Sequence, residues 1–225
     1  LTFPTEFKLF SLNLLPLQNE LLSVADNRSS HSISISLPNA DGQMEVFEMV
    51  EASNFEPALQ AQFPNIRAYS GRGVTDRSAT IKLSLSPQGI QTMVFRSDRQ
   101  AEFMEPYSQD ASVYVVYKSQ RSKTGLPWRC STVDQSLATS LNQQVNQSGI
   151  TARSGGDLKT MRLAQSVTAE YSNYFGETSS AQVSLVLAAV NTTMTRCNGV
   201  YEKDLALHLN LVANTTSVFY YNAST

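Results

Sequence analysis

The sequence predicts an α+β fold in two parts, an antiparallel β-rich part followed by a strand–helix–strand unit. Up to about Ser119, apolar and polar residues alternate in short runs separated by turn residues. Between about Gln135 and Asp157 the composition changes to Gln, Asn, Ser, Thr and Gly, which is typical of an exposed linker. Beyond it, apolar residues recur at helical spacing. We therefore expect a β-rich domain over residues 1–134, a flexible linker over 135–157 and a second domain over 158–225.

Two hairpins are expected in the first domain. The first consists of a strand at residues 32–37, a turn at 38–42 and a returning strand at 44–50. The second runs from 80 to 95 and turns at Pro87-Gln88-Gly89. A further strand is expected at 113–117. The helix signal in this domain is weak outside Pro57 to Phe63, so an antiparallel sheet is the expected architecture.

One helix is predicted in the second domain, between Ser180 and Cys197. Its apolar residues lie at spacings of four, three, four and three, which places them on one stripe of an α-helix. They are Val183, Leu187, Val190, Met194 and Cys197. Ser179 and Gln182 form a capping-box pattern, and Gly199 lies where a left-handed C-terminal cap is common.

A strand is predicted on each side of this helix, at residues 161–169 and 205–213. In the second strand Leu205, Leu207, Leu209 and Leu211 share one face, whereas His208 and Asn210 lie on the other. Strand, helix and strand in this order predict a βαβ unit with parallel strands and a right-handed crossover.

Composition and charge argue against two classes of partner. The chain has 17 Lys and Arg against 19 Asp and Glu and no basic cluster, so nucleic acid is not an expected partner. The longest apolar run, Leu185 to Val190, is far shorter than the roughly 18 residues that a membrane-spanning helix needs. No membrane span is expected.

Several stretches of the second domain carry a resemblance to a known family. They are Arg162-Leu163-Ala164, Thr168-Ala169-Glu170-Tyr171-Ser172, Asn191-Thr192-Thr193-Met194-Thr195-Arg196, Asn198-Gly199-Val200-Tyr201-Glu202-Lys203-Asp204-Leu205 and Asn210-Leu211-Val212-Ala213-Asn214. This part resembles the start of the catalytic domain of secreted bacterial reprolysin-like (adamalysin-type) zinc metalloproteases, which are metzincins. The first domain, with Ile35-Ser36-Leu37-Pro38 before Asp41-Gly42 and Pro64 to Gly71 before a strand, is similar to the propeptide of the same proteins.

The resemblance implies a function for each part of the chain. Residues 1–134 would be a propeptide that keeps the protease latent or assists its folding, and 158–225 would be the incomplete, βαβ opening of a metzincin-like α/β catalytic domain. The parent would be a zinc metalloendopeptidase that is secreted, extracellular or on the cell surface. Its expected partners are the remainder of the catalytic domain and protein or peptide substrates. The alternatives are a non-catalytic β-rich binding or adhesion module and an inactive relative of the protease.

The zinc ligands of this family form a His-Glu-x-x-His-x-x-Gly-x-x-His helix, with the Glu as general base. The sequence contains two histidines, His31 and His208, and neither has a second ligand at helical spacing. We therefore expect the zinc of the parent protein to be bound by residues beyond Thr225, and we expect no catalytic residue within this chain.

Cys130 is the candidate metal ligand of the chain, as an inhibitory cysteine switch that occupies the open position of the zinc. Arg129 beside it would favour the thiolate. The spacing from Pro127 to Cys130 resembles the adamalysin switch, but Ser131 stands where that switch usually has glycine. The alternatives are a disulfide with Cys197 and an inert thiol.

Arg153 and Ser154 form a candidate processing site, because a basic residue in an exposed linker is accessible to a protease. The alternative is an ordinary linker arginine. His208 is expected to be a solvent-facing or hydrogen-bonded strand residue, and Glu202 and Asp204 are expected to be surface or cap residues. The aromatic residues Tyr107, Tyr114 and Trp128 are expected in the core and at the edges of the β-rich domain.

Overall fold

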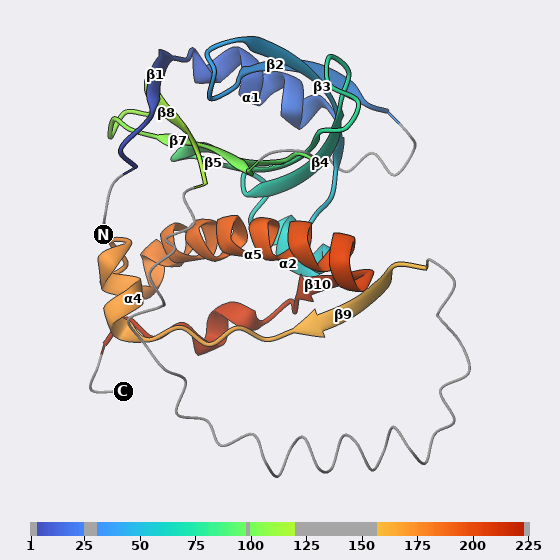
Figure 1. Cartoon of the computed structure of the whole chain (residues 1–225). Helices are drawn as coiled ribbons and strands as arrows, with labels where there is room; N and C mark the ends of the chain where they lie inside the picture. Colours follow the sequence, from blue (N-terminus) through green and yellow to red (C-terminus); the bar gives the residue numbers. More distant parts are fainter. Residues whose placement is uncertain (1–3, 25–30, 98–99, 120–156, 223–225) are drawn as a thin grey trace, which may run out of the picture. The chain divides into compact units, whose positions relative to one another are not determined.

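The computed structural model describes residues 4–24, 31–97, 100–119 and 157–222. The fold is mixed α+β, as predicted, with an antiparallel sheet of eight strands, a few helices and a parallel sheet of two strands in the described part (Figure 1). The predicted boundary at residue 134 lies outside the described residues, and the one at residue 157 lies at the edge of them. The division into domains therefore stays a prediction.

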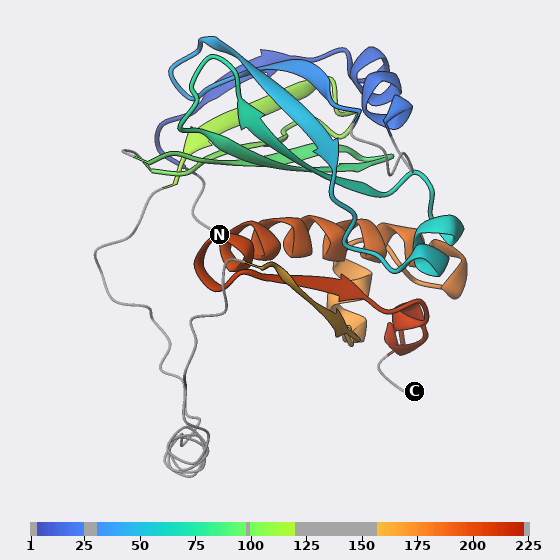
Figure 2. The ribbon, with the colours of Figure 1, turned by 90° about the vertical axis from the view of Figure 1, so that its right-hand side faces the viewer.

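The antiparallel sheet is a meander that closes back on the first strand. Its strand order is β1-β8-β7-β6-β5-β4-β3-β2, so each strand from β2 to β8 pairs with its neighbours in sequence and β1 pairs with β8. The strands are β1 (Lys8–Ser11), β2 (Ile33–Pro38), β3 (Met44–Glu51), β4 (Arg67–Gly73), β5 (Thr80–Ser86), β6 (Gly89–Phe95), β7 (Glu102–Pro106) and β8 (Val113–Lys118). Figure 2 shows that the sheet is curled. Because of this curl, Lys8 of β1 donates to the backbone oxygen of Asp41, in the turn between β2 and β3, at 2.5 Å.

Both predicted hairpins are confirmed, as is the strand at 113–117. Ile35 pairs with Phe47 in the first hairpin, and Leu83 pairs with Thr92 in the second. Gly42 and Gly89 have positive φ, as tight turns at these positions require. A side chain at Gly89 would also meet the hydroxyl of Tyr114, at 2.5 Å from an ideal Cβ.

Several elements of this part were not predicted. They are β1, β4, β7 and the helix α1 (Leu14–Ser23). Leu14, Leu17 and Leu21 of α1 have helical spacing, and Pro16 lies in the first turn, where proline is tolerated. β4 was missed because nearly all of its residues are buried, on both faces of the sheet, so it shows no alternation.

The core of this part lies between the curled sheet and α1. Leu17 and Leu21 of α1 pack with sheet residues that include Met49, Leu83 and Tyr114. Tyr114 is therefore a core residue, as expected, whereas Tyr107 is 54% exposed and Trp128 lies outside the described residues.

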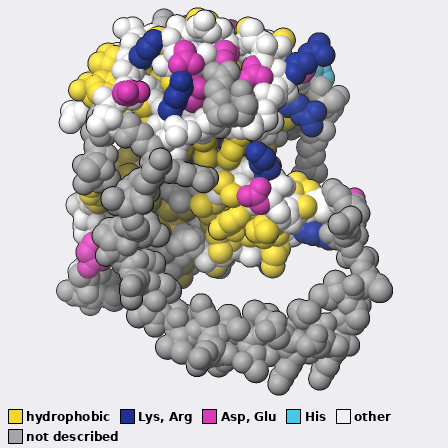
Figure 3. Space-filling model, viewed as in Figure 1, with side chains coloured by type: hydrophobic (Ala, Val, Ile, Leu, Met, Phe, Trp, Pro, Cys, Tyr) yellow, Lys and Arg dark blue, Asp and Glu magenta, His cyan; other side chains and the backbone are white. Residues whose placement is uncertain are grey.

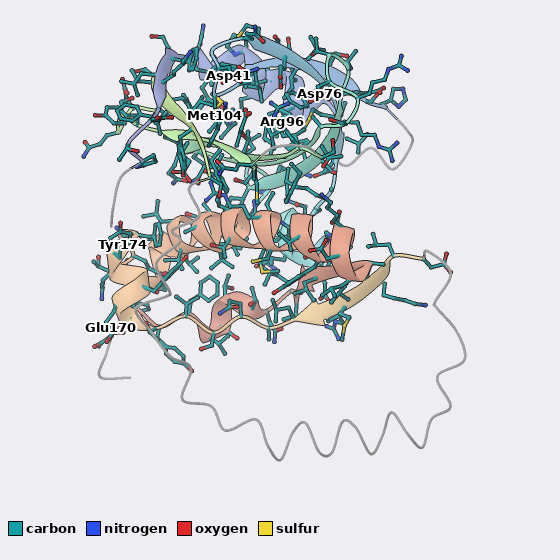
Figure 4. All side chains as sticks on the ribbon, in the orientation of Figure 1. Asp41, Asp76, Arg96, Met104, Glu170 and Tyr174 are labelled. Atoms are coloured by element: carbon teal, nitrogen blue, oxygen red, sulfur yellow. The ribbon has the colours of Figure 1, made fainter. Side chains whose placement is uncertain are left out.

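A buried charged cluster lies at one end of the same core. Arg96, the residue that follows β6, pairs with Glu45, Asp76 and Glu102, at nitrogen–oxygen distances of 2.7, 2.9 and 3.0 Å. Figure 4 labels Arg96 and Asp76 within the sheet region. Burial alone would lower the pKa of Arg96, but the hydrogen bonds that it donates to Glu102 and Glu45 outweigh burial and raise that pKa, so the guanidinium stays charged.

The C-terminal part is a βαβ unit with parallel strands, as predicted, but its first strand ends at Leu163 instead of continuing to Ala169, where a helix begins. β9 (Lys159–Leu163) pairs with β10 (Leu207–Leu211) in parallel, with Met161 opposite Leu209. Between them lie α4 (Ala169–Tyr174), the 3₁₀ turn η1 (Ser180–Gln182) and α5 (Val183–Leu205); η2 (Thr215–Val218) follows β10. In Figures 1 and 2, α5 lies between β4 and β5 on one side and β9 and β10 on the other.

The predicted end of the long helix was wrong. α5 continues through Gly199 to Leu205, and the residue with left-handed φ is Ala206. Leu205 therefore belongs to the helix and is exposed, instead of sharing a strand face with Leu207. Gly199 has a packing role: an ideal Cβ there would lie 2.8 Å from the ring of Phe95.

The predicted helix start at Ser180 coincides with the 3₁₀ turn η1, and α5 itself begins three residues later, at Val183. Ser179 precedes η1 but makes no capping hydrogen bond with its side chain. Instead, Oε1 of Gln182 accepts a hydrogen bond from the backbone N–H of Thr178 at 2.9 Å. The apolar stripe is buried at Leu187, Val190 and Met194 and half-buried at its two ends. No helix in the described ranges has the length and apolar character needed to cross a membrane.

Candidate functional site

The candidate site is the contact between the sheet part and the βαβ unit. Its main element is the segment between β3 and β4, residues 52–66, which contains α2 (Pro57–Gln62); we call this segment the clip. Phe55, Leu59 and Ile66 of the clip are buried, but in the core of the βαβ unit and not in the core of the sheet. They pack there with residues of α5 and β10 that include Leu187 and Leu211. The N-terminal part therefore supplies core residues to the C-terminal part.

The clip also extends the parallel sheet by one pairing. The N–H of Leu211 in β10 donates to the backbone oxygen of Asn54 at 2.7 Å, and the N–H of Glu56 donates to the backbone oxygen of Leu211 at 2.9 Å. Phe55 and Leu211 consequently form a parallel bridge. The outer edge of β10 is thus covered at this point by a segment from far earlier in the chain.

Asn54 is the most connected polar residue of the clip. Its side-chain nitrogen donates to Oδ1 of Asn191 at 2.9 Å and to the hydroxyl of Thr195 at 2.8 Å, and its oxygen accepts from the amide of Asn198 at 2.9 Å. Asn54 is 2% exposed, and all three partners on α5 are also buried. A buried carboxamide with partners for both its donor and its acceptor is stabilising, whereas one without them would be costly.

A second polar contact joins α5 and β10 to β5. Nδ1 of His208 lies 2.7 Å from Oε1 of Glu202, and the other carboxylate oxygen accepts from Lys82 of β5. Nε2 of His208 lies 3.2 Å from the backbone oxygen of Ser53, in the clip. Burial alone would raise the pKa of Glu202, but the hydrogen bonds from His208 and Lys82 outweigh it, so that pKa is below its ordinary value.

This cluster corrects one expectation from the sequence and refines another. Glu202 is not a surface or cap residue, because it bridges two elements with its side chain largely buried. The sequence did not reveal its partners because Lys82 lies 120 residues away. His208 is buried and hydrogen-bonded, one of the two possibilities expected for it, and Asp204 is exposed, as expected.

Two further ion pairs cross the same contact. Arg196 of α5 donates to Glu105 of β7 at 2.6 Å, and its guanidinium carbon lies 5.1 Å from the centre of the Phe103 ring. Arg162 of β9 donates to Glu56 of the clip. That hydrogen bond is the largest of the effects that lower the pKa of Glu56, whose side chain is half-buried.

A cavity of about 330 Å³ opens next to α5, on the side of α4. It is lined by Gln165, Ser166, Val167, Thr168, Tyr171, Val190, Thr193 and Met194. None of these side chains carries a charge at neutral pH, so the lining offers no ion pair to a ligand. Figure 4 places Glu170 and Tyr174 on α4, and Figure 3 shows hydrophobic side chains gathered on one face of the C-terminal part.

The residues of this region do not fit a zinc site. Among residues 4–24, 31–97, 100–119 and 157–222, no three His, Cys, Asp or Glu side chains lie close enough together to hold a metal ion. His31 is exposed, and His208 is engaged with Glu202. The candidate metal ligand Cys130 and the candidate processing residues Arg153 and Ser154 lie outside the described residues.

The C-terminal part matches the model of a known protein family. Residues 157–225 match the model of a family described as metallo-peptidase family M12B, reprolysin-like. The matched segment contains β9, α4, α5 and β10, and it does not contain the clip. A search of curated proteins found no match to the chain. The C-terminal segment is therefore related to metallopeptidases of the reprolysin-like type.

Proposed function

We propose that this chain is the N-terminal portion of a secreted zinc metalloendopeptidase. Residues 158–225 would open its catalytic domain, and residues 1–134 would form a propeptide that keeps the protease latent, assists its folding, or both. The family match to residues 157–225 is the observation that carries this proposal. It begins immediately before β9, so the matched segment coincides with the βαβ unit.

The clip supports a propeptide role for the N-terminal part. Phe55, Leu59 and Ile66 come from outside the family match, yet they are buried in the core of the matched segment. A segment that fills the core of another part stabilises that part while it is bound. This packing supports a role for the N-terminal part in assisting the folding of the matched segment.

The zinc of the parent would be held by residues outside this chain. The described side chains do not form a metal site, so we assign no catalytic step to them. In this proposal the histidine ligands lie on chain that follows Thr225, and the remainder of the catalytic domain is the partner of residues 158–225. Substrates would be proteins or peptides in an extracellular compartment or at the cell surface.

The proposal also assigns a role in latency to Cys130 and a role in processing to Arg153. The thiolate of Cys130 would occupy the open position of the zinc and so contribute to latency. Replacing it in the full-length precursor, as Cys130→Ala, should raise basal proteolysis; unchanged latency would remove this role. Processing at Arg153-Ser154 would make Ser154 the first residue of the activated protease, which N-terminal sequencing tests.

The test of the function is zinc analysis with a protease assay on the complete protein. The full-length precursor should contain about one zinc ion per chain. It should cleave casein slowly before the N-terminal part is removed and rapidly afterwards. A processed protein that contains no zinc and cleaves no casein would overturn the proposal and indicate an inactive relative.

A further inference from the structure

The face that α5 and β10 turn toward the clip has the properties of a peptide-binding site. We infer that this face recognises an extended peptide in which asparagine precedes an aromatic residue, and that residues 53–56 of the same chain are its ligand. The inference rests on the proposed function and deepens it, because it names the residues by which a propeptide would hold the catalytic segment. It also implies that the two parts stay bound when the linker between them is cut.

The backbone of the peptide is recognised by one residue of β10. Leu211 uses both its N–H and its C=O, toward the oxygen of Asn54 at 2.7 Å and the N–H of Glu56 at 2.9 Å. Pairing of this kind requires an extended peptide and is indifferent to its side chains. Leu211 therefore selects the conformation of the ligand, and sequence selectivity has to come from other contacts.

The asparagine side chain is recognised by residues whose own side-chain amides and hydroxyl are oriented by other hydrogen bonds. Asn198 both donates to the backbone oxygen of Leu209 and accepts from its N–H, each at 2.9 Å, so its amide cannot be turned over without losing both bonds. Its remaining donor faces the oxygen of Asn54 at 2.9 Å. This position of the ligand must therefore be an acceptor.

The other side of the carboxamide meets two acceptors. The amide nitrogen of Asn191 donates to the backbone oxygen of Arg67, which leaves Oδ1 to accept from Asn54. The hydroxyl of Thr195 donates to the backbone oxygen of Asn191 at 2.7 Å, which leaves a lone pair for Asn54. Aspartate has the same shape as asparagine, but it would place an unprotonated oxygen against both acceptors, in a region shielded from water. The site therefore selects asparagine over aspartate.

The aromatic residue that follows is held by apolar contacts. Phe55 is buried with residues of α5 and β10 that include Leu187 and Leu211. At the rim, Glu56 accepts from Arg162 and from the backbone N–H of Ala213. This arrangement, a buried aromatic anchor with charged groups around it, is common in tight protein interfaces.

Hydrogen bonds within the clip hold it in the conformation that the site binds. Gln60 accepts from the hydroxyl of Ser53 at 2.7 Å and donates to the backbone oxygens of Phe63 and Ile66. The same Ser53 hydroxyl accepts from the N–H of Phe55 at 3.1 Å. A ligand held in its bound conformation loses less entropy on binding, which favours high affinity.

The experiment uses the full chain with a specific protease site inserted in the predicted linker, residues 135–157, and cut after purification. The two pieces should elute together, and their dissociation constant is measured by dilution. Asn54→Asp should raise this constant roughly tenfold or more. The matched control, Asn65→Asp, makes the same change at an exposed position of the clip and should leave it unchanged. Equal dissociation constants for the cut native chain and the cut Asn54→Asp chain, or separation of the native pieces at micromolar concentration, would overturn the inference.

A competition experiment decides the matter if Asn54→Asp prevents folding. A synthetic peptide of residues 52–66 is added to the cut native chain, and release of the N-terminal piece is followed by size-exclusion chromatography. The native peptide should cause release, whereas the peptide with Asn54→Asp should not do so at the same concentration; equal effects would contradict the inference. Neither readout depends on catalysis, so a complete protein without zinc or proteolysis would remove the proposed function and leave this result standing.

Discussion

Glu202 accepts hydrogen bonds from two sides, with Nδ1 of His208 2.7 Å from one oxygen and Lys82 on the other. Glu202→Gln would keep the shape of the side chain but remove its charge, leaving the largely buried Lys82 without a carboxylate. We expect the free energy of unfolding in urea to fall by about 2 kcal/mol. Glu20→Gln, at an exposed position of α1, is the control and should change it by less than about 0.5 kcal/mol. An equal fall in the free energy of unfolding for the two variants would show that the contacts of Glu202 with His208 and Lys82 contribute nothing specific.

The same carboxylate should make stability depend on acidity. Because the pKa of Glu202 in the folded protein is below its ordinary value of 4.5, its contribution is complete above that value and is lost as the pH falls through the folded pKa. Urea unfolding of the native chain and of Glu202→Gln, measured between neutral pH and about pH 3, should therefore show a difference that shrinks below about pH 4.5. A difference that stays constant over this range would contradict the assignment.

Elements with a clear period were predictable from the sequence, and those buried on both faces were not. The alternation of Ile33, Ile35 and Leu37 marked β2, because one face of that edge strand is exposed. β4 carries no such signal, since the sheet core lies on one side of it and α5 on the other. A neighbour that arrives from more than 100 residues away cannot be read from a local window.

The same limit applies to the candidate site. Asn54 and Asn191 are 137 residues apart, and each looks like an ordinary polar residue in its own segment. Gly199 was interpreted as a helix end because glycine is common there. It lies instead within α5, where the helix approaches β5 closely, and only the packing reveals why a glycine occupies this position.

Gly199→Ala tests whether this close approach matters. Alanine favours a helix over glycine by about 1 kcal/mol, so a site with free space would be stabilised. Here the added Cβ would lie 2.8 Å from the ring of Phe95 and 2.9 Å from Cγ of Lys82, whose far end is held by Glu202. We expect the clash to outweigh the gain and the variant to be destabilised by about 1 kcal/mol in urea unfolding.

The neighbouring variant Val200→Ala provides the comparison, because Val200 is exposed and lies on the same helix. It should be neutral or slightly stabilising, since only helix propensity changes. An increase in stability for Gly199→Ala of the same size as for Val200→Ala would mean that α5 does not need glycine at this contact.

Arg96 tests the buried charge cluster of the sheet. Its side chain is inaccessible to solvent and pairs with Glu45, Asp76 and Glu102, of which Glu102 is nearly as buried. Arg96→Met would leave these carboxylates without their cation, and breaking a buried pair in this way costs about 3 to 5 kcal/mol. The free energy of unfolding should fall by that amount, whereas Arg72→Met, at an exposed position of β4, should change it little.

A double variant separates a lost ion pair from lost packing. If the cost arises from uncompensated charge, Arg96→Met combined with Glu102→Gln should lose less than the sum of the two single variants, because the second change removes one of the charges that the first leaves unpaired. If the cost arises only from the shape of the arginine side chain, the two losses should add. Additive losses in urea unfolding would therefore reject an electrostatic role for the cluster and leave Arg96 as a packing residue.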